Sequence, residues 1–484
     1  MSGALVALMV VPLAGALASG TAPPRLAKAL TVVAALATFG LAVSLVPSTR
    51  TADALSGWLR VDPLSLVFLL AVAFLYVTTA LFAVGYVRAA NDADARRYSR
   101  RFLAGLNLFA WAMVMAPVVN GFALLWVAVE VTTVVSALLV AIDDTDGAVE
   151  AAWKYVLIAS MGLGIALLAT LVMYYAGTSS LGSSYEPFYP RLLGSAGHLP
   201  PEFVRLSFGL AVVGFGTKMG LVPVHTWLPD AHSEAPTPVS ALLSGALLTV
   251  SFYAVLRFYQ VTARAVGSAY PRDVLLVFGL ASLALATLYV ARQRDLKRLL
   301  AYSSIEHMGI LAIGMSFAAP IAVVGVLLQV LAHAAAKSTA FFGAGSVIRK
   351  FGTKELGRVR GGMGALPWSG PMFLLSVLAL SAMPPFGIFR SEFLIVEGGL
   401  GSSATALVAV LVALVTVAFL GLSWYASQTM LTPLPEGVLR GEASTAMALA
   451  MGVGLAVLLV LGVHPPSELS HLLVRAAGEL KGER

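Results

Sequence analysis

Residues 216–258 read GTKMGLVPVHTWLPDAHSEAPTPVSALLSGALLTVSFYAVLRF, and this stretch decides how the rest of the chain is interpreted. An apolar run holds Lys218, a proline-interrupted segment with His225 and His232 follows, and a second apolar run ends the stretch. A charged side chain is costly to place in a membrane, and proline removes a helical hydrogen bond. The pattern predicts one half of an ion path through a membrane, with the rest of the chain as its scaffold.

The composition indicates an integral membrane protein. Hydrophobic residues make up 59% of the 484 residues and charged residues 11%, whereas a soluble domain carries about 25% charged residues. The apolar runs lack the alternation of a barrel, so they are interpreted as helices, which satisfy their own backbone groups in lipid. The absence of cysteine excludes disulfides, thiolate zinc sites and cysteine-bound iron–sulfur clusters. Any electron transfer would therefore take place in another subunit.

The net charge of +7 does not indicate nucleic-acid binding, because the basic residues lie in short loops where they set membrane topology. Loops after odd-numbered spans are richer in them than loops after even-numbered spans, which places both termini outside the cytoplasm. The apolar N-terminus, residues 1–20, lacks a basic leader region and is expected to remain as the first span. The first group of loops holds Arg25, Lys28, Arg88, Arg96, Arg97, Arg100, Arg101, Arg292, Arg294, Lys297, Arg298, Arg349, Lys350, Lys354, Arg358 and Arg360; the second holds Arg50, Arg60, Arg191, Arg264 and Arg272.

Apolar runs of membrane-crossing length predict an all-α protein with fourteen transmembrane helices. The longest polar connection, residues 177–202, is expected to be a surface loop. No soluble domain is inserted between the spans, which are expected near residues 3–20, 27–46, 63–87, 101–119, 121–142, 150–175, 203–222, 237–260, 273–291, 299–318, 321–348, 367–397, 402–430 and 443–463.

Two of these spans are interrupted by proline. Span 7 holds the Gly220–Pro223 segment and Pro229, and span 12 holds MPPFG at residues 383–387. Paired interruptions in corresponding positions are typical of inverted repeats with a functional midplane. The expected organisation is therefore two inverted five-helix repeats between flanking spans: residues 1–100 with spans 1–3, 101–262 with spans 4–8, 272–430 with spans 9–13, and 431–484 with span 14 and a tail.

Ionisable side chains within the apolar runs are the candidate functional residues, because each costs at least about 2.5–3.5 kcal/mol at membrane depth. They are Glu130, Lys154, Lys218, His333 with Lys337, and Glu392. Glu130 is interpreted as a proton-relay carboxylate paired with Lys218, the alternative being a structural ion pair. An opposite charge keeps both groups ionised while burial favours their neutral forms, so such a pair can switch.

The histidines are interpreted as hydrogen-bonding or proton-carrying groups, since no pair has the spacing of a metal site. This applies to His225 and His232, for which a purely structural role is an equal alternative. His333 and Lys337 are four residues apart and share a helical face, which suits a carrier of one proton at a time. Glu392 is either a terminal proton donor at the outlet or a local partner of Arg390 at the membrane edge.

Glu306 and His307 near the start of span 10 would extend the path if they lie deep enough. They belong to the segment DLKRLLAYSSIEHMG, residues 295–309.

These segments, with residues 216–258, 333–337 and 383–392, resemble the antiporter-like subunits of respiratory complex I. The same family includes Mrp-type cation/proton antiporter subunits and membrane subunits of group 4 [NiFe] hydrogenases. The sequence segments AHSEAPTPVSALLSG and SSIEHMG are most similar to those of the hydrogenase-4 F subunit type. The resemblance covers roughly residues 60–430.

The resemblance implies fourteen helices with inverted repeats and a hydrated proton path at the midplane. By motif position, the path residues are Glu130, Lys154, Lys218, His333 with Lys337, and Glu392. Many relatives carry a lysine in span 8 where this chain has Thr249. That departure implies a central relay through water, His225 or His232.

The function expected from the resemblance is proton translocation, or exchange of protons for Na⁺, driven by a partner redox module with Fe–S, NiFe or flavin centres. Protons would be taken up near Lys154 or the cytoplasmic loops and released by Glu392. The location would be a bacterial or archaeal inner membrane. The alternatives are a subunit of a non-redox Mrp-type antiporter or inorganic-carbon transporter, and an inactive membrane scaffold.

Overall fold

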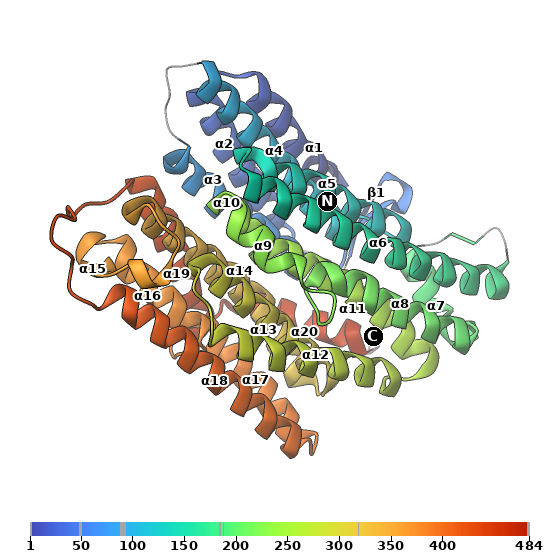
Figure 1. Cartoon of the computed structure of the whole chain (residues 1–484). Coiled ribbons are helices and arrows are strands. Elements are labelled where there is room, and N and C mark those ends of the chain that lie inside the picture. Colours follow the sequence, from blue (N-terminus) through green and yellow to red (C-terminus); the bar gives the residue numbers. More distant parts are fainter. Residues whose placement is uncertain are drawn as a thin grey trace.

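The computed structural model describes residues 2–47, 51–87, 93–182, 185–186, 188–317 and 319–481. Arg50 and Arg88, two of the loop charges used to predict the orientation, lie outside these residues. Figure 1 shows long helices that run in one common direction, with the first half of the chain beside the second. A short antiparallel hairpin, β1 (Ala52–Ala54) and β2 (Leu59–Val61), lies before α3.

Eleven helical segments among the described residues are long and apolar enough to cross a membrane. Helix α13 (Leu296–Ser316) and two interrupted pairs lie where the sequence predicts three further crossings: α8 (Pro201–Met219) with α9 (Trp227–Glu234), and α16 (Ser369–Leu380) with α17 (Gly387–Gly401). The all-α membrane fold is therefore confirmed. The eleven are α1 (Ser2–Thr21), α2 (Pro24–Ser44), α3 (Pro63–Tyr86), α4 (Ala93–Val118), α5 (Phe122–Val140) with its 3₁₀ extension, α6 (Asp146–Leu181), α10 (Thr237–Leu242) continuing through a π-turn into α11 (Leu248–Val266), α12 (Ala269–Val290), α14 (Pro320–Phe351), α18 (Thr405–Met430) and α19 (Thr445–Val463).

The two proline-containing breaks lie where the sequence predicts them. α8 ends at Met219 because Gly220 takes a left-handed conformation with φ of 84°, which glycine adopts without steric cost. Pro223 follows, and helix resumes at Trp227. In span 12 the residues between α16 and α17 include Pro384 and Pro385. Four predicted spans, α10 with α11, α12, α13 and α14, lie between the two broken spans. Spans 7 and 12 would therefore cross the membrane in opposite directions, as inverted repeats require.

The connection before α8 is more ordered than expected. α6 continues to Leu181, and a short helix, α7 (Tyr189–Gly194), follows. The Tyr189 ring is buried against Phe122, with 5.1 Å between ring centroids. Burial of aromatic surface therefore orders a segment that its polar composition predicts to be a surface loop.

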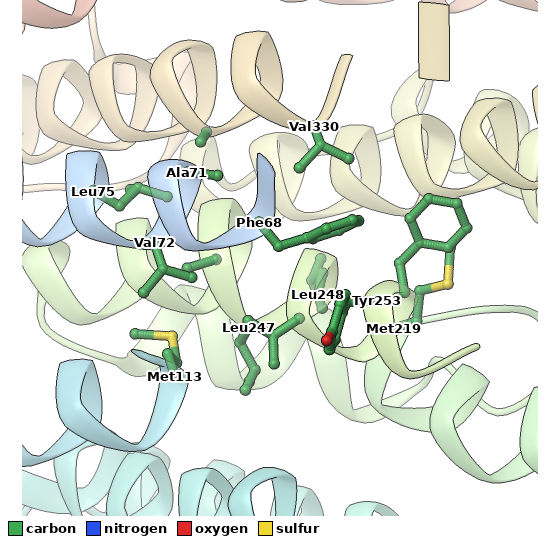
Figure 2. Packing of buried hydrophobic residues seen from close by; sticks show 14 of the residues in the cluster. Phe68, Ala71, Val72, Leu75, Met113, Met219, Leu247, Leu248, Tyr253 and Val330 are labelled. Carbon is green, nitrogen blue, oxygen red and sulfur yellow. The ribbon is translucent and has the colours of Figure 1, made fainter. Parts of the chain in front are cut away.

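The centre of the bundle is the contact between α3 and the segment joining α10 to α11. Figure 2 shows Phe68 and Leu75 of α3 facing Leu247 and Tyr253. The rings of Phe68 and Tyr253 lie 5.2 Å apart. Helices α1, α2 and α18, by contrast, keep many apolar side chains exposed. Their outer faces therefore form apolar surface at the periphery of the bundle.

Candidate functional site

Lys218, at the end of α8, is fully buried and bonded to hydroxyl groups. Its Nζ donates to Thr133 Oγ1 of α5 at 2.7 Å and to the hydroxyl of Tyr155 on α6. The Tyr155 hydroxyl lies 2.7 Å from Ser136 Oγ. Helices α5 and α6 therefore surround this amine of α8 with neutral oxygen atoms.

Glu130 lies one turn before Thr133 on α5 and is only partly buried. Its Oε2 atom is buried without a hydrogen-bond partner among the described residues. Glu130 and Lys218 interact electrostatically, yet the amine bonds to hydroxyls and the described chain shows no direct ion pair between them. The predicted pair is thus a through-space electrostatic interaction and not a direct contact.

His225 and His232 lie on either side of the start of α9 but do not form one site. His225 is 7% exposed, and its Nδ1 has no partner in the described chain. His232 is fully buried, with Nδ1 2.7 Å from the carbonyl oxygen of Leu228. Its Nε2 lacks a hydrogen-bond partner among the described residues. His232 is therefore a buried imidazole with one nitrogen available to water or a proton.

A second buried lysine lies where α10, α13 and α14 meet. Lys337 Nζ donates to the carbonyl oxygen of Leu300 at 3.0 Å and to the hydroxyl of Ser303. One turn earlier, His333 Nε2 lies 3.2 Å from the carbonyl oxygen of Ser244. Ser244 belongs to the π-turn Leu243–Leu247, a local widening that is often found at functional sites. Lys337, like Lys218, is thus bonded to neutral oxygen atoms.

Glu392 does not form the alternative pair with Arg390. Arg390 donates instead to the carbonyl oxygens of Gly462 and Val463, while Glu392 faces the interior. Its Oε1 accepts from Gln329 Nε2 at 3.3 Å and lies 3.7 Å from His307 Nδ1. The alternative interpretation, a local pair of Glu392 with Arg390, is therefore wrong, because the two side chains have different partners.

The histidine and carboxylate of α13 complete this second cluster. α13 begins at Leu296, so Glu306 and His307 lie mid-helix and are buried, not near the helix end. The His307 ring is 5.2 Å from that of His333. Glu306 interacts electrostatically with Lys337, and its Oε2 has no described partner. A continuous row of titratable groups thus runs from Lys337 to Glu392.

Two predicted positions lie outside these clusters. The Lys154 side chain is 50% exposed and forms ion pairs with Glu150 at 2.6 Å and Asp230 at 3.5 Å. It therefore belongs to a surface charge cluster, not to the buried interior as its place in an apolar run suggests. The Thr249 hydroxyl donates to the carbonyl oxygens of Gly245 and Ala246 in its own helix. Its hydroxyl proton is therefore bonded within the helix.

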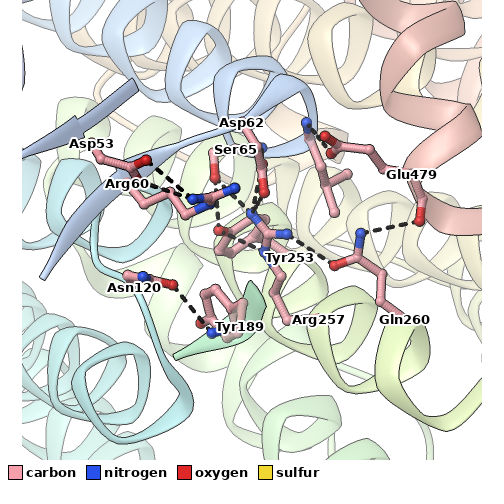
Figure 3. A network of polar contacts seen from close by, with 11 residues as sticks. Asp53, Arg60, Asp62, Ser65, Asn120, Tyr189, Tyr253, Arg257, Gln260 and Glu479 are labelled. Atoms are coloured by element: carbon pink, nitrogen blue, oxygen red, sulfur yellow. Dashed lines mark hydrogen bonds and ion pairs between the residues drawn. The ribbon is translucent and has the colours of Figure 1, made fainter. Parts of the chain in front are cut away.

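Sequence reasoning missed the neutral partners and one buried ion pair. The sequence does not single out Tyr155, Ser303 or Gln329 as site residues, because hydroxyl and amide side chains are common in membrane helices. Arg257 of α11 is buried, and its Nη2 donates to both oxygens of Asp62 at 2.7 Å (Figure 3). Arginine near a span end ordinarily reaches the interface, so the sequence gave no reason to pair these two residues.

The C-terminal helix α20 (Ser467–Lys481) is bonded to residues next to this ion pair. Glu479 of α20 accepts from the backbone nitrogen of Leu64 at 3.2 Å, and Gln260 Nε2 donates to its carbonyl oxygen at 3.3 Å. Burial, reinforced by the nearby negative charge of Asp62, raises the pKa of Glu479 to about 8 from 4.5. Folding thus favours the protonated carboxyl group.

We expect the docking of α20 to weaken as pH rises from about 4.5 to about 8. Glu479 must then ionise in a buried site, so its contribution is complete below the lower pH and lost above the higher one. Glu479→Gln should remove this dependence, whose slope is at most about 1.4 kcal/mol per pH unit for one proton. The rate of proteolysis of α20 across this pH range measures the dependence.

Glu468→Gln, a change at an exposed position of the same helix, is the control and should keep the wild-type pH profile. A Glu479→Gln profile equal to that of the wild type would refute the assignment of the pH dependence to Glu479.

Among the described residues no group of three or more His, Asp or Glu side chains is arranged to hold a metal ion. The clusters therefore offer proton-carrying chemistry: amines, imidazoles and carboxyl groups connected by hydroxyls and amides. All of them lie between Glu130 and Glu392 in the sequence.

The same part of the chain matches a known family. The family model described as "NADH:quinone oxidoreductase/Mrp antiporter, TM" matches residues 120–421. The hydrogenase-4 component F homolog of Methylacidiphilum infernorum is 35% identical, over 74% of this chain and 75% of that protein. NADH-quinone oxidoreductase subunit N of Desulforudis audaxviator is 31% identical, over 80% and 76% of the two chains.

A solved structure shows the same fold. A chain in the structure of the Mrp complex from Dietzia sp. superimposes with a TM-score of 0.85, at 20% identity, over 99% of this chain and 98% of that one. The relatives are named as components or subunits of larger complexes. The family match spans both buried clusters of titratable groups, from Glu130 to Glu392, and the chain belongs to the NADH:quinone oxidoreductase/Mrp antiporter family of membrane subunits.

Proposed function

We propose that this antiporter-like membrane subunit moves protons along the buried row from Glu130 to Glu392. The observation that carries the proposal is the environment of Lys218 and Lys337. Both amines are fully buried and bonded to hydroxyl or carbonyl oxygens, with no direct carboxylate partner in the described chain. Such an amine can release and regain a proton without breaking an ion pair.

The proposed order follows the contacts. A proton is held on Lys218, tuned through space by Glu130, and passes by water to Nε2 of His232, which has no hydrogen-bond partner among the described residues. It then reaches Lys337 and His333, crosses to Glu306 and His307, and leaves through Glu392. His232 takes the central role because Thr249 is bonded within its own helix. His225, open at Nδ1, is a side branch near Lys218, and Lys154 serves only as a surface group on the uptake side.

The proposed setting is a redox-driven complex in a bacterial or archaeal inner membrane, with both termini outside the cytoplasm. Relatives named as hydrogenase-4 and NADH-quinone oxidoreductase subunits support this setting. A partner module would hold the redox centres, and residues 101–262 and 272–430 would form the two repeats. The likeness to a chain of an Mrp complex supports the second candidate, cation/proton antiport without redox chemistry.

Purification of the tagged chain with its native partners, followed by reconstitution into liposomes, tests the proposal. We expect redox subunits to co-purify and redox turnover to change the pH of the lumen in Na⁺-free buffer. Proton movement that requires a Na⁺ gradient and no redox partner would favour the antiporter. Full redox turnover in sealed liposomes without any pH change would refute proton translocation.

A further inference from the structure

A basic cavity of about 520 Å³ lies at the start of α4, away from the proton path. Four arginines of one helix form most of its wall, and the remaining described lining residues are small. None of these lining residues is acidic. They are Arg96, Arg97, Arg100 and Arg101 with Gly20, Ala93 and Ala104.

The arginines are arranged as two stacked pairs. Arg96 and Arg100 are four residues apart, as are Arg97 and Arg101, so each pair lies along one side of the helix. Like charges at this spacing destabilise a helix by a few tenths of a kcal/mol. Arg100 Nε donates to the carbonyl oxygen of Ala22 at 3.0 Å, which fixes its guanidinium beside the end of α1. The Arg100 side chain is thus held at the cavity, and the four guanidinium groups make its described wall basic.

The surface next to the cavity is apolar. Gly20 is in the last turn of α1, where an added Cβ would lie 3.5 Å from Ala104 Cβ. Leu17 lies one turn earlier on α1 and is 70% exposed, and Leu26 in the first turn of α2 is 51% exposed. Both helices are long enough to span the membrane and only a third buried within the chain. A charged cavity therefore opens directly beside an exposed apolar face.

We propose that this cavity binds the phosphate headgroup of an anionic phospholipid, whose acyl chains lie along the exposed face of α1 and α2. Guanidinium groups bind phosphate oxygens in bidentate fashion. Basic pockets at the ends of membrane helices recognise anionic lipids. The small side chains leave room for a headgroup, and the volume lies within the range of ligand sites. An acidic protein surface would match the arginines but would leave Leu17 and Leu26 uncovered.

The test compares the full chain, in its purified membrane complex, in nanodiscs of phosphatidylcholine and of equal parts phosphatidylcholine and phosphatidylglycerol. We expect phosphatidylglycerol to raise the Tm and to be retained in native mass spectrometry. The double variant Arg97→Gln with Arg101→Gln should bind it roughly tenfold or more weakly. The double variant Arg292→Gln with Arg360→Gln removes the same charge from exposed loop positions and should behave as wild type.

Four results would overturn the proposal. Equal lipid retention by the cavity variant and the wild type would exclude this site. Equal losses in both double variants would show a general charge effect. The same rise in Tm with inorganic phosphate alone would show a site for free anions. If the glutamine variant does not assemble, Arg97→Lys with Arg101→Lys keeps the charge without the bidentate geometry, and unchanged lipid retention by it would refute phosphate recognition by these arginines.

Discussion

Lys218→Met is expected to reduce proton translocation by this subunit to the passive leak of the liposomes. Methionine fills similar space but has no proton to release. The hydroxyl groups of Thr133 and Tyr155 would lose the amine that donates hydrogen bonds to them. Stability should be unchanged or higher, because the substitution removes a buried amine that lacks a direct counter-charge. The initial rate of lumen pH change per redox turnover measures the effect.

Lys350→Met is the matched control. Lys350 lies in the last turn of α14 and donates to the carbonyl oxygen of Gly441, away from both clusters. It should retain wild-type proton translocation. If Lys218→Met pumps as well as Lys350→Met, Lys218 is structural.

Glu392→Gln is expected to cause a loss of the same size. Glutamine keeps an acceptor for the Gln329 amide but cannot release a proton, so the row ends at His307. Arg390→Gln is the control, because Arg390 contacts the carbonyl oxygens of Gly462 and Val463, not Glu392. The same liposome assay measures both variants. An equal loss in Arg390→Gln would show that the effect does not depend on a proton released by Glu392.

Much of this arrangement follows from the sequence, because a charge in a membrane span is rare and costly. That cost singles out Lys218, Lys337 and His333, and the structure buries all three. Proline at two points predicts both helix breaks for a local steric reason. Such features depend only on neighbouring residues, which a sequence shows directly.

Features set by distant residues could not be predicted. The side chain of Arg390 turns to the end of α19, which no local pattern specifies. Asp62 and Arg257 meet across 195 positions of sequence. Lys154 is in an apolar run, yet the rotation of α6 leaves it exposed beside Asp230. Helix rotation and long-range packing, not residue type, decided these cases.

The central claim is that Lys218 and Glu392, in opposite halves of the chain, act on one proton path. The most direct test is the number of protons moved per redox turnover in liposomes containing Lys218→Met or, separately, Glu392→Gln. One path predicts that both variants fall to the same value, with the whole contribution of this subunit lost. If each variant lost only part of this subunit's protons per redox turnover, and kept the part moved by the other half of the chain, the claim of one path would be contradicted.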